Sequence, residues 1–253
     1  AGKMPGADDL KQYWVNLCGS KSNINEFPNN RWEDCAPLAR GKKADYRKGG
    51  YLEEIDKFDT EFFNISPQEA KYMNPMQRLL LQTSYEAIED AGYGGESIYG
   101  SNAGVYIGVE STSILNYNQL FSKSDSMMFT GSMNGILASR ISFHYNLKGP
   151  SMVIDTACSS SLTAIIMACQ ALESNQCDLA IVGGICLNLL PSLKKNILDM
   201  VESGDDLIRA FDQNANGTSW GEAVGLIVIK PLWKAIKDGD SVQAVIKGWA
   251  INN

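Results

Sequence analysis

The chain has 253 residues, 44% of them hydrophobic, and a formal net charge of −7 from 22 basic and 29 acidic side chains. This length and composition predict one compact globular body. The negative charge argues against general affinity for nucleic acid or an anionic membrane, because both select for excess lysine and arginine. We find no signal segment and no apolar stretch approaching the roughly 20 residues that span a bilayer. We therefore expect a cytoplasmic protein whose partners are small molecules or other proteins.

Local patterns predict helices and strands that alternate along the chain. The predicted elements, in chain order, are a helix at 76–91 that ends at Gly92, a strand at 104–110, a helix at 135–147, a strand at 151–157, a helix at 158–174, a strand at 178–187, a strand and then a helix within 224–240, and a last strand at 241–251. Apolar strands alternating with helices indicate a parallel or mixed sheet covered on both faces, which is an α/β fold. No repeat or linker divides the chain, so we place no internal domain boundary.

Cysteine usage favours reduced thiols over disulfides or a zinc site. None of the 6 cysteines forms a CxxC pair, and the chain holds a single histidine. Since zinc sites of the usual kind need clusters of cysteine and histidine, we expect no bound metal.

One cysteine stands where a strand ends and a helix begins. In IDTACSSSL, residues 154–162, Cys158 precedes serines, which favour helix starts. The apolar residues that follow helical spacing after it are Leu162, Ile165, Ile166, Cys169 and Leu172. The free N–H groups and the positive end of that helix would stabilise a thiolate and hold the oxyanion formed when it attacks a carbonyl. On geometry alone, a small buried cysteine without a chemical role is an equally good interpretation.

The motif around Cys158 belongs to a longer pattern. The stretches that carry it are MPGADDLKQYWVNL, GGYLEEIDKFDTEFFNISPQEAKYMNPMQRLLLQTSYEAIEDAG, LASRISFHYNLKGPSMVIDTACSSSL, RAFDQNANGTSWGEAVGLIVIKPL and AVIKGWAINN. In order and spacing they resemble the β-ketoacyl synthase (ketosynthase) domain of modular type I polyketide synthases, whose nucleophile motif DTACSSSL is unbroken here.

This resemblance implies a thiolase-like fold of αβαβα layers made of two similar halves, with residues 1–253 as the N-terminal portion. It implies that Cys158 accepts an acyl chain from the phosphopantetheine arm of an acyl carrier protein, without a bound cofactor. A malonyl-type extender on another carrier then loses carbon dioxide, and its carbanion attacks the thioester to give a β-ketoacyl product. The implied partners are the carrier protein, the C-terminal half of the ketosynthase and a second copy in a homodimer.

The family's catalytic histidines are expected to lie outside this chain. By the resemblance they belong to HGTGT-like and NIGH-like segments of the C-terminal half, with a nearby lysine. We interpret the single histidine, His144, as a structural helix residue. A fragment of a full ketosynthase is the favoured explanation, and a partner polypeptide that supplies the second half is the alternative. The chain alone is expected not to complete condensation.

By the same resemblance, residues 126–135 line the acyl pocket near the dimer interface. Met128, Thr130 and Met133 are the candidate substrate-binding residues. Flexible methionines suit an adaptable apolar pocket, but methionines are at least as often core residues without a role in binding.

Two further segments each have a structural and a functional interpretation. Residues 212–222 resemble a calcium loop, but Ala223 occupies the position of the bidentate acid, so we expect a structural turn. The basic side chains Arg40, Lys42, Lys43, Arg47 and Lys48 are expected to form a solvated loop. The functional hypothesis is that these basic side chains bind an acidic carrier protein.

Two other functions stay open. The first is a non-catalytic dimerisation or carrier-gating scaffold that keeps the motif without turnover. The second is the equivalent domain of an animal-type fatty acid synthase. The matches to RISF..NLKGPS and GT..GE favour polyketide assembly.

Overall fold

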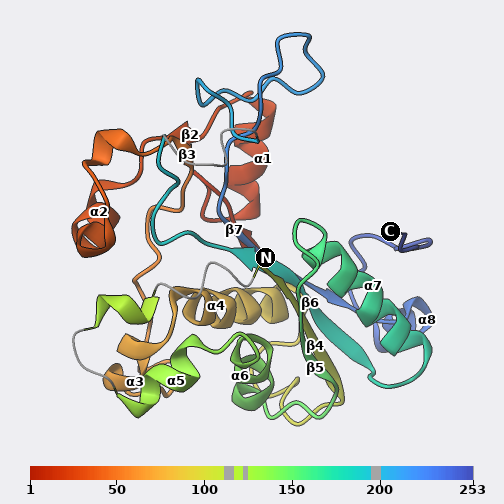
Figure 1. The fold of residues 1–253 in the computed structure, drawn as a ribbon. Coiled ribbons are helices and arrows are strands. Elements are labelled where there is room, and N and C mark those ends of the chain that lie inside the picture. Colours follow the sequence, from red (N-terminus) through yellow and green to blue (C-terminus); the bar gives the residue numbers. More distant parts are fainter. Residues whose placement is uncertain (111–116, 122–124, 195–200, 253) are drawn as a thin grey trace.

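A central five-stranded sheet organises the protein. The computed structural model describes residues 1–110, 117–121, 125–194 and 201–252 (Figure 1). The strand order is β1-β7-β6-β4-β5, in which β4, β5 and β6 run parallel while β7 and β1 run antiparallel to their neighbours. The strands of this sheet are β1 (Gly2–Lys3), β4 (Ala103–Val109), β5 (Ser151–Ile154), β6 (Leu179–Cys186) and β7 (Ala223–Ile229). The predicted mixed α/β sheet is confirmed.

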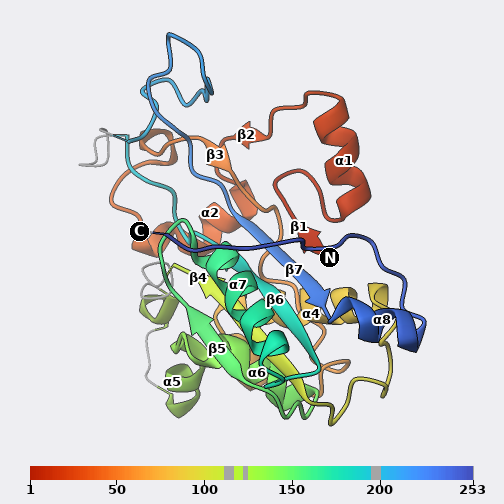
Figure 2. The same cartoon turned by 90° about the vertical axis from the view of Figure 1, so that its right-hand side faces the viewer.

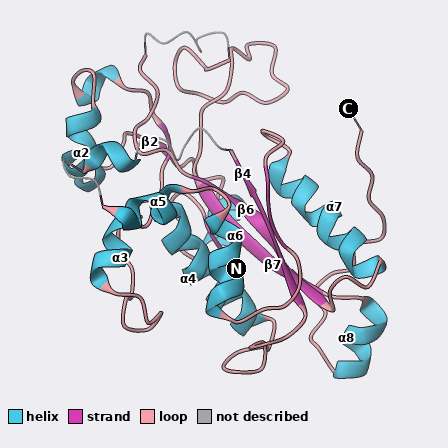
Figure 3. Ribbon diagram, turned by 60° about the horizontal axis from the view of Figure 1, so that its bottom comes forward, coloured by secondary structure: helices cyan, strands magenta, loops and turns pink. Residues whose placement is uncertain are grey.

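Helices cover both faces of the sheet, α7 on one side and α4 with α6 on the other (Figure 3). The helices are α1 (Leu10–Cys18), α2 (Asn29–Cys35), α3 (Pro67–Tyr72), α4 (Pro75–Asp90), α5 (Ser126–Ser132), α6 (Ile136–His144), α7 (Ser160–Glu173) and α8 (Leu232–Asp238). A small antiparallel pair, β2 (Ile24–Asn25) and β3 (Gly49–Gly50), lies in the N-terminal region. Within the described ranges, no helix has the length and apolarity needed to cross a bilayer.

Strand β4 shows why these sequences form a buried sheet. All of its residues are buried, and successive side chains point to opposite faces. Val105 and Ile107 pack into the cluster that α4 and α6 cover, while Tyr106 packs into the cluster under α7. A strand buried on both faces therefore has a continuous apolar sequence.

Helix α7 packs on the sheet through small side chains. Ala164, Ala168 and Ala171 are buried, and they share a cluster with Tyr106. Leu162 is 66% exposed. The apolar stripe expected from helical spacing therefore meets the sheet only in part: Leu172 is buried with the alanines and Ile165 packs against the same cluster, while Leu162 faces solvent.

Several predicted bounds differ from the structure. Strand β5 ends at Ile154, α7 begins at Ser160, and α6 ends at His144, so each is shorter than predicted. The predicted strand at 241–251 is wrong, because the described chain from 241 to 252 is an extended segment that runs past α7 without strand pairing (Figure 2). Its apolar residues stay exposed, as at Ile246 with 47%. A β-rich sequence becomes a strand only when a neighbour pairs with it.

Candidate active site

The chain turns sharply between β5 and α7. Ala157 has φ 54°, a left-handed conformation that residues with a Cβ rarely adopt. The carboxylate Oδ1 of Asp155 accepts the Ala157 N–H at 3.1 Å, which closes a local turn. The turn delivers the next residue, Cys158, to the start of the helix.

Cys158 is exposed and lies directly before Ser159, the residue that caps α7. Ser159 makes no side-chain capping hydrogen bond; its hydroxyl donates to the Thr156 carbonyl at 2.8 Å instead. A side-chain cap therefore does not occupy the N–H groups of the first turn, and the positive end of α7 lies beside Cys158. This is the position that the sequence predicted, and the thiol does not point into packed hydrocarbon.

The first turn of α7 rests on a pair of glycines in adjacent strands. Gly108 of β4 and Gly184 of β6 are neighbours in the parallel register. A Cβ on Gly108 would stand 2.4 Å from the Ser161 nitrogen, and one on Gly184 would stand 2.9 Å from the Ser161 Cβ. Since real Cβ contacts are not this close, any side chain at Gly108 would push the start of α7 away from the sheet.

The other cysteines differ from Cys158 in their surroundings. All 6 are free thiols, of which only Cys18 and Cys158 are exposed. Burial raises the pKa of Cys35, Cys169 and Cys177, and it raises the pKa of Cys186 to about 11, where the negative charges of Glu110 and Glu222 add to the effect. These thiols stay protonated near neutral pH. Cys18 and Cys158 are therefore the two cysteines that we expect to react with an electrophile.

His144 is the last residue of α6, and it packs against aromatic rings. Its ring centroid lies 5.3 Å from that of Phe63 and 4.7 Å from that of Tyr145. Burial lowers its pKa, which favours the neutral imidazole. These contacts agree with the structural role inferred from the sequence.

The predicted pocket residues lie on or next to α5. Met128 is half-buried, Thr130 is exposed, and Met133, which follows the helix, is 42% exposed. Helix α5 packs on α3 and α6. Contacts of the described residues do not bring the three side chains to Cys158, so their role in substrate binding stays a prediction.

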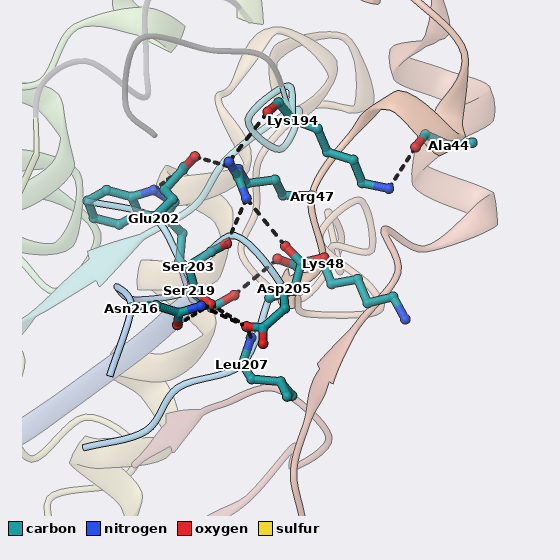
Figure 4. Close-up of polar contacts among 12 residues, drawn as sticks. Ala44, Arg47, Lys48, Lys194, Glu202, Ser203, Asp205, Leu207, Asn216 and Ser219 are labelled. Carbon is teal, nitrogen blue, oxygen red and sulfur yellow. Dashed lines mark hydrogen bonds and ion pairs between the residues drawn. The ribbon is translucent and has the colours of Figure 1, made fainter. Parts of the chain in front are cut away.

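The expectation that the basic run is solvated is wrong for Arg47. This residue is buried, and its Nε lies 2.7 Å from Oε2 of Glu202 (Figure 4). Its Nη1 donates to the Ser203 carbonyl at 2.7 Å. Arg47 therefore fixes the loop that begins at 201 to the N-terminal region, and it cannot be a docking group. Arg40, Lys42 and Lys48 are exposed.

Asp205 in the same loop accepts hydrogen bonds that favour its charged form. Arg209 donates to its carboxylate with Nη2 at 2.7 Å, and Ser203, Asn216 and the Leu207 N–H donate to it as well. Together they hold the pKa of Asp205 well below its ordinary value. Figure 4 shows Ser203, Asn216 and Leu207 around this carboxylate. A carboxyl whose pKa is lowered by folding stabilises the protein above its unfolded pKa, and this contribution is lost as the pH falls.

We therefore expect Asp205→Asn to lower the thermal midpoint at pH 7. Because the variant has no carboxyl to protonate, its midpoint should fall less steeply than that of the wild type below about pH 4. Thermal unfolding followed by circular dichroism between pH 3 and 7 measures both effects. Asp8→Asn, at an exposed aspartate, is the control and should follow the wild-type curve. Parallel curves for Asp205→Asn and the wild type would contradict the prediction.

Glu222, the acid nearest the end of the calcium-like loop, belongs to a buried ion pair. Its Oε2 and Oε1 accept from Nη1 and Nη2 of Arg31 at 2.6 and 2.8 Å. At the loop's start, Oδ1 of Asp212 accepts the Asn214 N–H at 2.7 Å. The segment is a structural turn whose acid binds an arginine.

Sequence reasoning missed the residues that support the turn at Cys158, namely Ala157, Ser160, Gly108 and Gly184. A signal for two of them was present. Glycine inside a strand marks a place where another backbone approaches closely, and both Gly108 and Gly184 interrupt apolar strands.

Comparison with known proteins identifies the family of this fold and site. A model of the family described as "Beta-ketoacyl synthase, N-terminal domain" matches residues 1–235. The chain belongs to the β-ketoacyl synthase family. The chain is 38% identical over 267 residues to the polyketide synthase PksL of Bacillus subtilis, and 40% identical over 254 residues to PksM of the same organism. Each alignment covers 100% of this chain and 6% of the relative.

The solved structures agree with this assignment. The ketosynthase from module 6 of the bacillaene synthase of Bacillus subtilis 168 is 37% identical and superposes with a TM-score of 0.80, over 95% of this chain and 40% of that one. The expected thiolase-like fold is confirmed by this likeness. Both curated relatives are polyketide synthases, so the resemblance to polyketide ketosynthases is also confirmed and the fatty acid alternative is not favoured. This β-ketoacyl synthase chain spans less than half of the solved ketosynthase.

Proposed function

We propose that this chain is the acyl-accepting part of a ketosynthase, a condensing enzyme of polyketide chain elongation, with Cys158 as its nucleophile. The observation that supports the proposal most strongly is the exposed Cys158 at the positive end of α7, directly after the left-handed Ala157. Family membership supplies the reaction class, and this turn supplies a reactive group suited to it.

In the proposed reaction the Cys158 thiolate attacks the thioester carbonyl of an acyl chain carried by phosphopantetheine. A bond forms between Cys158 Sγ and the carbonyl carbon, the bond from that carbon to the carrier's sulfur breaks, and the released thiolate takes up a proton. The N–H groups at the start of α7 stabilise the negative oxygen of the intermediate. The phosphopantetheine arm belongs to the acyl carrier protein and enters as substrate, so this step uses no cofactor of the chain's own.

The second step, decarboxylative condensation with a malonyl-type extender, is proposed to require the C-terminal half with its histidines. A homodimer is proposed through β5, the edge strand of the sheet, where Met152 is 39% exposed. Met128, Thr130 and Met133 remain the proposed acyl-pocket residues. A cytoplasmic location stays a prediction.

Limited alkylation tests the nucleophile. With substoichiometric iodoacetamide at neutral pH, we expect Cys158 to react at least about tenfold faster than Cys18, because only Cys158 has a helix N-terminus beside it. A short acyl thioester of pantetheine should add one acyl group to the same residue. Peptide mapping by mass spectrometry locates both adducts, and Cys158→Ala should abolish them while Cys18→Ala leaves them unchanged.

A scaffold without turnover predicts a different result. In that case the two exposed thiols are alkylated at similar rates, and no acyl group is transferred. Either finding would overturn the assignment of Cys158. Acylation without formation of a β-ketoacyl product, after addition of a malonyl-charged carrier, is the expected behaviour of this chain.

A further inference from the structure

Ser160, the first residue of α7, connects the helix to the turn before Cys158. It is only 5% exposed. Its hydroxyl Oγ accepts the Thr156 N–H at 2.9 Å and donates to the Ala157 carbonyl at 2.6 Å. One side chain therefore holds the two residues that immediately precede Cys158.

These hydrogen bonds explain how Ala157 keeps its left-handed conformation. A residue with a Cβ adopts this conformation at a cost of about 1–3 kcal/mol, so neighbouring contacts must hold it there. The Ser160 hydroxyl holds the N–H of Thr156, one residue before Ala157, and the carbonyl of Ala157 itself, so it bridges the residue with the left-handed conformation. Without these two hydrogen bonds, fewer contacts hold Ala157 in its left-handed conformation, and the turn can relax toward ordinary backbone angles.

The position of Ser160 is in turn fixed by the sheet. The carbonyl carbon of Ser160 lies 2.5 Å from the point where a Cβ on Gly108 would stand, and the Ser161 nitrogen lies 2.4 Å from it. The first turn of α7 thus lies directly on β4. A continuous set of contacts runs from β4 through Ser160 to the turn that carries Cys158.

We propose that Ser160 is a positioning residue for the Cys158 nucleophile. Its hydroxyl holds the turn so that the thiol lies at the positive end of α7, and it takes no part in bond making. Serine suits this place because its hydroxyl both accepts and donates, whereas alanine does neither. The inference rests on the proposed function of Cys158.

The neighbouring serine provides a matched control. Ser159 is exposed, and its hydroxyl donates to the Thr156 carbonyl at 2.8 Å without reaching Ala157. Ser159→Ala and Ser160→Ala remove the same group one residue apart. Only the second removes the bridge across Ala157.

The experiment measures iodoacetamide alkylation of Cys158 and Cys18 in the same molecules from pH 6 to 10, well below the thermal midpoint. In Ser160→Ala we expect the Cys158 rate at neutral pH to fall by about tenfold, as loss of a well-formed buried hydrogen bond would produce. The pH dependence of the Cys158 alkylation rate should move to higher pH in this variant. Cys18 should keep its rate, Ser159→Ala should match the wild type, and Ser160→Thr, which retains a hydroxyl, should restore most of the Cys158 rate.

Unchanged Cys158 rate and pH profile in Ser160→Ala would overturn this inference alone. Equal slowing of Cys18 would overturn it too, since that result indicates general loosening of the fold. If Ser160→Ala does not fold, Ser160→Cys, which is close in shape and a poorer hydrogen-bonding group, takes its place with the same expectations, and fragment-ion mass spectrometry separates alkylation at position 158 from alkylation at position 160. By contrast, a wild-type protein in which Cys158 reacts no faster than Cys18 overturns the proposed function itself.

Discussion

Replacing Glu222 by alanine is expected to lower the free energy of unfolding by about 3–5 kcal/mol, because it leaves a buried arginine without its partner. Glu222 is 1% exposed and Arg31 is 3% exposed. The carboxylate also accepts the N–H groups of Leu52 and Asn188, both at 2.9 Å, while Arg31 donates to the carbonyls of the same two residues, both at 2.7 Å. The pair thus joins α2, the segment after β3, the exit of β6 and the entry of β7.

Urea unfolding at neutral pH measures this effect. The single variants Arg31→Met and Glu222→Met, with the double variant that carries both, form a double-mutant cycle. The double variant should be more stable than the sum of the single losses predicts, because neither charge is left alone. Asp178→Asn, which breaks the exposed pair with Lys234, is the control and should change stability by no more than about 0.5 kcal/mol. A loss below about 1 kcal/mol for Glu222→Ala would contradict the assignment of a buried, satisfied pair.

The sequence predicted those elements whose signals are local. Strand β4 and helix α4 were each predicted within one residue of their observed bounds, because a continuous apolar run and a glycine after the helix need no knowledge of the rest of the chain. Helix α1 was not predicted, although Leu10, Tyr13, Trp14 and Leu17 follow helical spacing; in the structure only Asn16 of this helix is buried, so the stripe is largely exposed. Its capping residue Asp9, which accepts the Gln12 N–H at 2.7 Å, was a second signal.

Features that depend on distant neighbours could not be predicted in this way. The segment 241–251 has the composition of a strand, but pairing decides whether a strand forms. Arg47 belonged to an apparent run of surface charge, and only the fold shows that Glu202 lies opposite it. At the active site, the place of Cys158 followed from a local motif. The support from Gly108 did not, because it depends on how closely α7 approaches β4.

The close approach between β6 and β7 gives the second large expected effect. A Cβ on Gly183 would lie 2.0 Å from the carbonyl oxygen of Gly225 and 3.0 Å from the Cα of Leu226. These are backbone atoms of the neighbouring strand, so they cannot move aside without disturbing the pairing that joins β6 to β7. We expect Gly183→Ala to lower the free energy of unfolding by about 3 kcal/mol, the upper end of the usual cost of overpacking.

Gly225, on the opposing strand, is a matched control because nothing stands within 4 Å of the point where its Cβ would lie. Gly225→Ala should leave stability unchanged or raise it by about 0.5 kcal/mol, since alanine restricts the unfolded chain more than glycine does. Urea unfolding of both variants decides the matter. If Gly183→Ala lowered the free energy of unfolding no more than Gly225→Ala does, the two strands would separate easily at this point. In that case β6 could not provide the rigid support that the start of α7 needs beneath Cys158.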